Sequence, residues 1–191
     1  MNKDLQKRYD DLKAKVKVRA DEFAELMEFV ETKTQWLTAP ASTRFHLCVE
    51  HGLLEHSINV AETLIRIKNT LYPLIDDESC VIVALLHDLG KAGTPEGAQY
   101  IKNQPTERQR QYGYGPTYPY SFNKNLTYLS VPIRSLYLAL PYITLTEEEA
   151  QAIAYHDGQY VDDNKSASGN ERPLTLLLHY ADNWCGFVVE K

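Results

Sequence analysis

Apolar residues recur every three or four positions through the first part of the chain, between residues 3 and 35. The stripe consists of Leu5, Tyr9, Leu12, Val16, Phe23, Leu26 and Val30. This spacing puts the side chains on one face of an amphipathic helix, and the intervening lysines and arginines form a solvated face. The pattern therefore predicts one long helix over residues 3–35.

Two more helices are predicted on either side of Pro73, which stops the first of them. Over residues 52–71 the apolar positions again share one side of a helix. Residues 80–86 are apolar on every face, and a helix of that kind lies in the middle of a fold. We expect this segment at the centre of the core, with Gly90 and Gly93 ending the helix.

Residues 93–130 differ in character from the rest of the chain, since they contain four prolines and six tyrosines. Aromatic residues at this density favour an ordered loop or a small β excursion over a disordered linker. A long loop in a small domain is often functional, so we expect a wall or lid over a site. The tyrosines are Tyr100, Tyr112, Tyr114, Tyr118, Tyr120 and Tyr128. Most are predicted to be packing residues, and a minority to stack on a nucleobase.

Helical patterns resume after this segment and continue to the last residues. A helix is predicted near residues 132–140, and Thr146 and Glu149 form a capping box for the next. Pro173 suits the first position of a final helix that runs to about Cys185. The predicted fold is all-α and the 191 residues form a single domain, with an N-terminal helix in residues 1–39 and a core in residues 40–185.

Composition and charge narrow the function. The chain has 20 lysines and arginines against 26 aspartates and glutamates, a formal net charge of −6, which disfavours duplex DNA as a partner. A small phosphorylated substrate is still allowed, because a metal ion can supply local positive charge. The three scattered cysteines predict reduced thiols, and no signal peptide or membrane span is visible. We therefore expect a cytoplasmic protein.

The segment Ala84-Leu85-Leu86-His87-Asp88-Leu89-Gly90-Lys91 carries the most informative chemistry. A His–Asp pair at the end of a buried helix needs partners, and a metal ion is an efficient one. His56 and Asp182, on two other predicted helices, are candidate further ligands. Imidazole nitrogen with carboxylate oxygen suits Mn²⁺, Fe²⁺, Co²⁺, Ni²⁺ or Zn²⁺, and ligands drawn from three helices leave coordination positions for water and substrate.

The order of these strings resembles the H…HD…D motif of the HD superfamily of metal-dependent phosphohydrolases. The strings are Gly-Leu-Leu-Glu-His56-Ser, Leu-Leu-His87-Asp88-Leu-Gly-Lys91 and Leu-His-Tyr-Ala-Asp182. More closely, the chain resembles small bacterial proteins related to the HD module of 3′→5′ exoribonucleases, with the strings Pro40-Ala41-Ser42-Thr43-Arg44-Phe45-His46 and His156-Asp157-Gly158. The resemblance implies an all-α helical bundle that acts as a phosphomonoesterase or phosphodiesterase on a nucleotide or short nucleic acid.

Three departures from the pattern refine this expectation. Relatives often carry a Gly-His-Gly string that helps to hold a second metal, whereas the matching stretch here is Leu129-Ser130-Val131-Pro132. We therefore expect one divalent ion per chain. Position 51 is histidine where relatives tend to have glycine, and the glutamate that some nucleotidases place before the His–Asp pair is absent from residues 83–85.

The predicted mechanism is metal-assisted hydrolysis of a phosphoester. Asp88 is assigned as both ligand and proton acceptor, and Lys91 as the cation that offsets charge on the phosphoryl oxygens. Arg44 and His46 are assigned to binding of the phosphate. The interpretation of His156 as a substrate contact is favoured over a metal contact.

Other assignments remain open at this point. His179, on the same helix face as Asp182, is predicted to be a satisfied core residue. One rival function is a non-catalytic HD-fold sensor that binds metal and nucleotide without turnover. Another is a factor for single-stranded nucleic acid, for which the chain offers only the local cations Arg108, Arg110 and Lys124.

Overall fold

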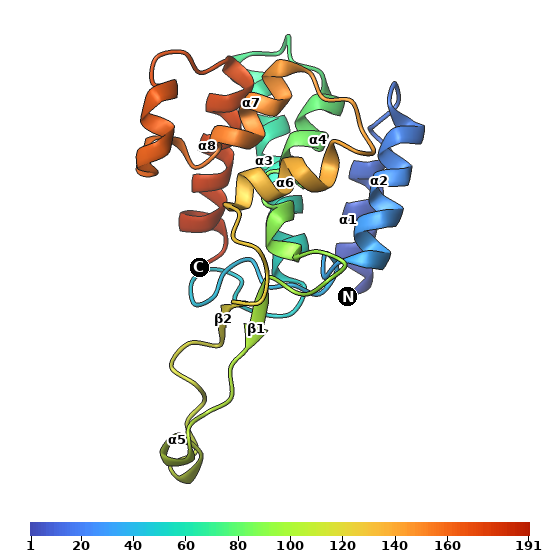
Figure 1. The fold of residues 1–191 in the computed structure, drawn as a ribbon. Helices are drawn as coiled ribbons and strands as arrows, with labels where there is room; N and C mark the ends of the chain where they lie inside the picture. Colours follow the sequence, from blue (N-terminus) through green and yellow to red (C-terminus); the bar gives the residue numbers. More distant parts are fainter.

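The computed structural model describes all residues from 1 to 191. Helices build the body of the molecule, and a two-stranded hairpin projects from one end of it (Figure 1). The predicted all-α fold with a small β excursion is thereby confirmed. A cluster of 35 buried apolar side chains forms the core between the helices.

The N-terminal segment forms two helices, so the prediction of one long helix is wrong. Helix α1 spans Lys3–Lys13 and α2 spans Ala20–Lys33, and the two lie side by side (Figure 1). The predicted apolar stripe is buried nevertheless, because both helices present it to the same core. The break occurs where the backbone amides of Lys17 and Val18 donate to the Glu78 carboxylate at 2.6 and 2.7 Å. Periodicity alone does not reveal such a distant acceptor.

Arg19 completes this break as the centre of a nearly buried ion network. Its guanidinium lies 2.9 Å from Glu78 and 2.7 Å from Glu149, whose side chain is 1% exposed. Burial opposes ionisation of Glu149, but the hydrogen bonds from Arg19 outweigh it and lower the pKa of this carboxyl. The pKa of Glu78 is lowered too, since backbone amides and Arg19 overcome the effect of burial. The network ties the N-terminal pair to the rest of the core.

Helices α3 (Gly52–Leu71) and α4 (Asp77–Leu86) form the centre of the body (Figure 1). Every residue from 80 to 86 has zero exposure, which confirms the central position expected for this segment. Helix α4 ends at Leu86, earlier than predicted, and a short 3-10 turn follows at Leu89–Ala92. A Cβ at Gly90 would lie 2.4 Å from the Val131 carbonyl oxygen, so this glycine allows close packing instead of ending the helix.

The C-terminal half adds helices α6 (Val131–Ala139), α7 (Glu147–Tyr155) and α8 (Pro173–Trp184). The predicted capping box at the start of α7 is confirmed, with Glu149 N donating to Thr146 Oγ1 and Thr146 N donating to Glu149 Oε2. Two short 3-10 segments, Gly158–Tyr160 and Asp162–Ala167, connect α7 to α8. Beyond α8 the chain continues as a π turn, Cys185–Val189, which was not predicted.

Residues 100–124, here called the arm, project from the end of the body where α3 begins (Figure 1). Strands β1 (Tyr100–Lys102) and β2 (Tyr120–Phe122) pair antiparallel at its base, and α5 (Glu107–Gln111) lies at its tip. Helix α5 has no buried residue. The prediction that most tyrosines of this segment pack is wrong, because the side chains of Tyr112, Tyr114, Tyr118 and Tyr128 are exposed.

Two further observations bear on the sequence predictions. All three cysteines are free thiols, as expected. No helix combines the length and the apolar character needed to cross a membrane. The cytoplasmic location stays a prediction.

Candidate metal centre

The structure brings together four of the predicted ligands from three helices. His56 lies near the start of α3, and Asp182 lies on α8. His87 and Asp88 directly follow α4. His56 Nε2 lies 3.0 Å from Asp182 Oδ1 and 3.6 Å from Asp88 Oδ2. His87 Nε2 lies 3.5 Å from Asp88 Oδ2 and 4.0 Å from Asp182 Oδ1.

The histidines turn the same ring nitrogen toward this centre because the other nitrogen is held from behind. His56 Nδ1 donates to the Glu190 carboxylate at 2.9 Å, and His87 Nδ1 donates to the Ala84 carbonyl at 2.7 Å. Such bonds fix the ring orientation of metal-ligating histidines. The Nε2 atom of His87 is buried and has no hydrogen-bond partner, whereas the buried Nε2 atom of His56 lies 3.0 Å from Asp182 Oδ1. A buried polar atom without a partner is costly, so His87 Nε2 is suited to a further ligand, and His56 Nε2 lies beside the same carboxylates.

Glu190 is a residue of this centre that no sequence motif indicated. Its side chain is 2% exposed and accepts hydrogen bonds from His56 Nδ1 and, at 2.9 Å, from Asn59 Nδ2. The π turn after α8 brings it back across α3, and Glu190 N donates to the Cys185 carbonyl at 3.0 Å. Only the folded chain places this carboxylate behind His56.

The charges of the centre favour a cation. Three carboxylates, from Asp88, Asp182 and Glu190, lie within ion-pair distance of the histidines, and Lys91, which contacts Asp88, is the one lysine or arginine that pairs with any of them. Burial disfavours protonation of His56, but the neighbouring carboxylates outweigh it and raise the pKa of this imidazole to about 9. The site therefore stabilises positive charge at His56 Nε2. At His87, burial dominates and lowers the pKa to about 4, which keeps that imidazole neutral.

Lys91 lies in the 3-10 turn after the His–Asp pair and reaches back to it. Its Nζ lies 2.5 Å from Asp88 Oδ2, and the side chain is 17% exposed. Burial opposes its charge, but the Asp88 carboxylate more than compensates and raises the pKa of Lys91. The same ion pair helps to hold the pKa of Asp88 well below its usual range, against the effect of burial. Lys91 is thus at the centre, in direct contact with a predicted ligand.

His156 follows α7, and both Asp88 and His87 lie within reach of its ring. Its Nε2 lies 3.6 Å from Asp88 Oδ1, its Nδ1 donates to the Ile153 carbonyl at 2.9 Å, and its ring packs against His87 with 4.8 Å between centroids. His87, Asp88 and His156 form a second group with ligand spacing. Like His56 and His87, His156 is held through Nδ1 and turns Nε2 toward Asp88. The sequence interpretation of His156 as a substrate contact did not anticipate this orientation.

His46 and Arg44 lie on the loop before α3, and only one of them reaches the centre. The His46 ring packs against His56 with 4.9 Å between centroids, and His46 Nε2 lies 3.9 Å from Glu190 Oε2. Arg44 is exposed and stacks on Phe45 and Tyr118, with its Cζ 4.7 and 5.2 Å from the two ring centroids. The structure therefore places Arg44 against the arm and not among the buried histidines.

Two other histidines have structural explanations. His51 adopts a left-handed backbone with φ of 69° at the N-cap of α3, a conformation that favours glycine and accounts for the glycine expected there. His179 is satisfied, since it hydrogen-bonds the His156 carbonyl at 2.7 Å. It is only half-buried, however, so its prediction as a core residue is wrong.

The donor set fits a divalent transition metal. His56, His87 and Asp182 offer ligand atoms that lie within 4.8 Å of one another, and Asp88 lies between both histidines. Imidazole nitrogens together with carboxylate oxygens are the ligands that Mn²⁺, Fe²⁺, Co²⁺, Ni²⁺ and Zn²⁺ accept in proteins. The unpartnered Nε2 atom of His87 and the excess of carboxylates are the two features that such an ion satisfies.

The helical body and this buried centre of histidines and aspartates define a helical protein built around a candidate metal site. In a comparison with protein families, the model of the HD domain matches residues 53–184, which is more than half of the chain. The chain therefore belongs to the HD domain family, a family of metal-dependent phosphohydrolases. No curated protein and no solved structure matches the chain, so the closer resemblance to exoribonuclease modules stays a prediction.

Proposed function

We propose that the protein is a phosphohydrolase that cleaves phosphoesters of a nucleotide or short nucleic acid with one divalent transition-metal ion per chain. The observation that carries this proposal is the buried Nε2 atom of His87, which has no hydrogen-bond partner and lies with His56 Nε2 among the carboxylates of Asp88 and Asp182. A purely structural cluster gains nothing from leaving such a nitrogen unsatisfied.

In this mechanism His56, His87, Asp88 and Asp182 hold the ion. When bound there, a divalent ion would supply Lewis-acid chemistry for the activation of water and the polarisation of the phosphoryl group. The carbonyl of Ala84 and the carboxylate of Glu190 keep the two imidazoles in position from behind. Because Ala84 belongs to α4 and Glu190 directly follows the π turn, both supports are held by ordered backbone, as a preorganised site requires.

In the proposed reaction Asp88 accepts a proton, and Lys91 stabilises negative charge on the phosphoryl oxygens. The two Asp88 oxygens have different surroundings, since Oδ2 faces Lys91 and Oδ1 faces His156. Asp88 Oδ1 is assigned as the acceptor of the proton released by the attacking water. The Lys91 ammonium and the His156 imidazole bind the non-bridging oxygens, where negative charge increases during the reaction.

The test is a hydrolysis assay on Mn²⁺-loaded protein with an aryl phosphate, an aryl phosphodiester and nucleotides, alongside elemental analysis. His87→Ala and Asp88→Asn are expected to lose bound metal and hydrolysis together, because the ligands act in the chemistry only through the ion. Lys17→Ala, an exposed substitution at the opposite end of the body, is the matched control and retains both. Full hydrolysis by a protein without metal would refute the proposal. Metal binding without turnover of any substrate would favour the rival function of a sensor.

A further inference from the structure

The arm carries a charge opposite to that of the rest of the molecule. Residues 100–124 contain four cations, Lys102, Arg108, Arg110 and Lys124, and one anion, Glu107, so the arm has a net charge of +3. The whole chain has a net charge of −6, so the remaining residues carry −9. None of the four cations forms a salt bridge. A projecting segment with unpaired positive charge suits a polyanionic partner.

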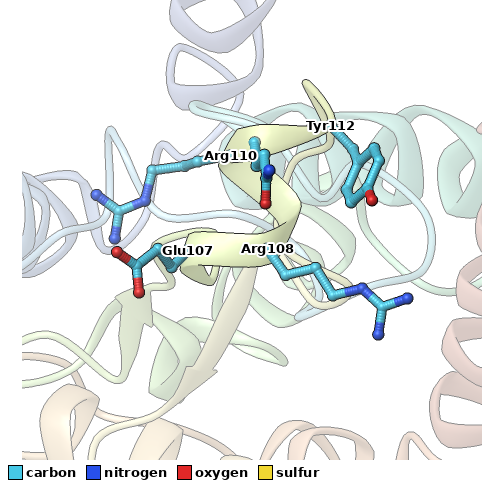
Figure 2. A pocket seen from close by; sticks show the side chains of 5 residues that line it. Glu107, Arg108, Arg110 and Tyr112 are labelled. Atoms are coloured by element: carbon cyan, nitrogen blue, oxygen red, sulfur yellow. The ribbon is translucent and has the colours of Figure 1, made fainter.

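Exposed aromatic rings accompany these cations. Tyr112 and Tyr114 are 64% and 69% exposed, and neither makes a ring contact with another aromatic side chain. Figure 2 shows the side chains of Arg108 and Arg110 extending to opposite sides of the arm's tip, with the Tyr112 ring on the side of Arg108. Flat rings beside guanidinium groups form a stacking platform for unpaired bases, whose faces are accessible only in a single strand.

The base of the arm joins this platform to the metal centre along the loop before α3. Arg44 Nη1 donates to Tyr118 Oη at 3.3 Å, and Tyr120 N donates to the Thr43 carbonyl at 3.4 Å. The same loop continues to His46, whose ring packs against His56. Cations and aromatic rings are thus present at the tip of the arm, at its base and beside the predicted ligands.

A second connection runs along the strands of the arm. A small cavity of about 120 Å³ is lined by Lys91 together with Tyr100, Lys102 and Tyr120 of the two strands. Gln99, the residue before β1, lines this cavity and also a larger groove of about 940 Å³ that includes Phe122 and Lys124. A groove of this volume is large enough for a nucleotide. Lys91 and the strands of the arm therefore line one cavity, and Gln99 lines both this cavity and the nucleotide-sized groove.

We infer that the arm binds single-stranded nucleic acid and presents one of its phosphodiesters to the buried histidines and aspartates. This inference rests on the proposed phosphohydrolase function and names the class of substrate. Phosphates contact the cations of the arm, and unpaired bases stack on Tyr112 and Tyr114. The negative body repels the same strand, so the strand is confined to the arm and the adjoining groove.

The inference is tested by fluorescence anisotropy with a labelled twelve-nucleotide single strand, in low salt and with EDTA to prevent turnover. The variant Arg108→Glu/Arg110→Glu is expected to lose at least about tenfold in affinity and to show a weaker dependence on salt, because fewer phosphates are neutralised. Tyr112→Ala/Tyr114→Ala is expected to lose about tenfold or more through lost stacking. A duplex of the same length is expected to bind more weakly than the single strand.

The matched control is Lys17→Glu/Arg66→Glu, which makes the same change in net charge at two exposed positions outside the arm. Its affinity for the single strand is expected to equal that of the parent. Equal losses in the control and in the arginine variant would overturn the inference, because net charge alone would then explain binding. Melting temperatures of all variants establish that each is folded.

Two further outcomes separate this inference from its rivals. If the parent protein is a dimer, the arginine variant is a monomer and neither binds the oligonucleotide, then a second copy occupies the arm and the inference is wrong. If the parent hydrolyses an aryl phosphodiester but binds the single strand without help from the arm, the inference fails and the proposed function stands. If binding follows the arm but no ester is hydrolysed, the arm assignment stands and the hydrolase proposal fails.

Discussion

The metal centre and the arm differ in the burial and pairing of their charged side chains. At the centre, Lys91 lies 2.5 Å from Asp88, Glu190 accepts a hydrogen bond from His56, and all of these side chains are largely buried. In the arm, Arg108 and Arg110 are without ion pairs and α5 contains no buried residue. Buried charges must satisfy one another, so removing one disturbs its neighbours, whereas exposed charges are free to meet a partner. The body thus combines stability with a preformed site, and the arm contributes contacts without contributing to the core.

The largest effect on stability is expected from Arg19, the partly buried cation that links Glu78 to Glu149. Arg19→Met leaves Glu78 and Glu149 without their cation, and breaking a buried network of this kind costs about 3–5 kcal/mol. Urea unfolding at pH 7 measures this cost. The exposed pair of Lys7 and Asp11 supplies the control, because Lys7→Met is expected to leave the unfolding midpoint nearly unchanged.

The same variant has a predicted pH dependence. The folded-state pKa values of Glu78 and Glu149 are lowered from 4.5, so the stability that they contribute is present above pH 4.5 and is lost as the pH falls through the lower folded values. The difference in stability between the parent and Arg19→Met is therefore expected to shrink below pH 4.5. A difference that grows in acid would contradict the assignment of both glutamates as ionised partners of Arg19.

Lys91 tests whether a buried charge at the centre serves the reaction or the fold. In Lys91→Met, kcat and kcat/KM are expected to fall together by about 10²-fold, the scale for removing one preorganised charge-stabilising group, with metal content unchanged. Steady-state kinetics on an aryl phosphodiester and elemental analysis give the answer. A rise in KM at constant kcat would restrict Lys91 to holding the substrate, and unchanged kinetics would remove it from the site.

Glu190 tests the support behind a predicted ligand. In Glu190→Gln the side chain keeps its shape but loses the charge that faces His56 Nδ1, so the affinity for Mn²⁺ or Zn²⁺ is expected to fall about 10- to 100-fold. Competition with a fluorescent chelator measures this affinity without any assay of activity. Glu50→Gln, an exposed substitution with the same chemistry, is the control. An unchanged affinity in Glu190→Gln would mean that the π turn alone positions His56.

The smallest effect on stability is expected from shortening the arm. Replacing residues 103–119 with Asn-Gly joins β1 to β2 through a two-residue turn in the observed register, in which Lys102 pairs with Tyr120. Unfolding free energy is expected to change by no more than about 2 kcal/mol, since a long loop closes at little cost and its side chains are exposed. Leu85→Ala, a single change in α4, is expected to cost about 2–5 kcal/mol. If shortening the arm lowered the unfolding free energy more than Leu85→Ala does, the arm would contribute to the core, and the contrast between arm and body would be wrong.

The fold was largely predictable because apolar periodicity reports which faces are buried. Helices α3, α7 and α8 match the predicted segments, and α4 lies where it was predicted but ends earlier. Even the misjudged N-terminal region buries the expected stripe. The break before α2 was not predictable, since it depends on Glu78, a carboxylate about 60 residues away in sequence. Periodicity describes a segment and its solvent exposure, and it carries no information about a distant acceptor.

The candidate site was predictable to the extent that its residues lie in recognisable strings. The packing of three helices brings the four predicted ligands together in the structure, namely His56, His87, Asp88 and Asp182. Glu190 was missed because its position results from a π turn and belongs to no motif. The exposed tyrosines were misjudged for a different reason, since aromatic composition alone does not distinguish a packed loop from a projecting hairpin.

The complete burial of residues 80–86 of α4 has a consequence for hydrogen exchange. Their amide protons are expected to exchange with solvent only when the whole body unfolds, whereas those of the arm are expected to exchange through local openings. Two of the predicted ligands, His87 and Asp88, directly follow this helix. An ion that binds only the folded state at a thousandfold excess over its Kd would add about 4 kcal/mol to global stability. Occupancy of the centre would therefore slow exchange across the entire helical body by about a thousandfold, and leave the amides of the arm as fast as before.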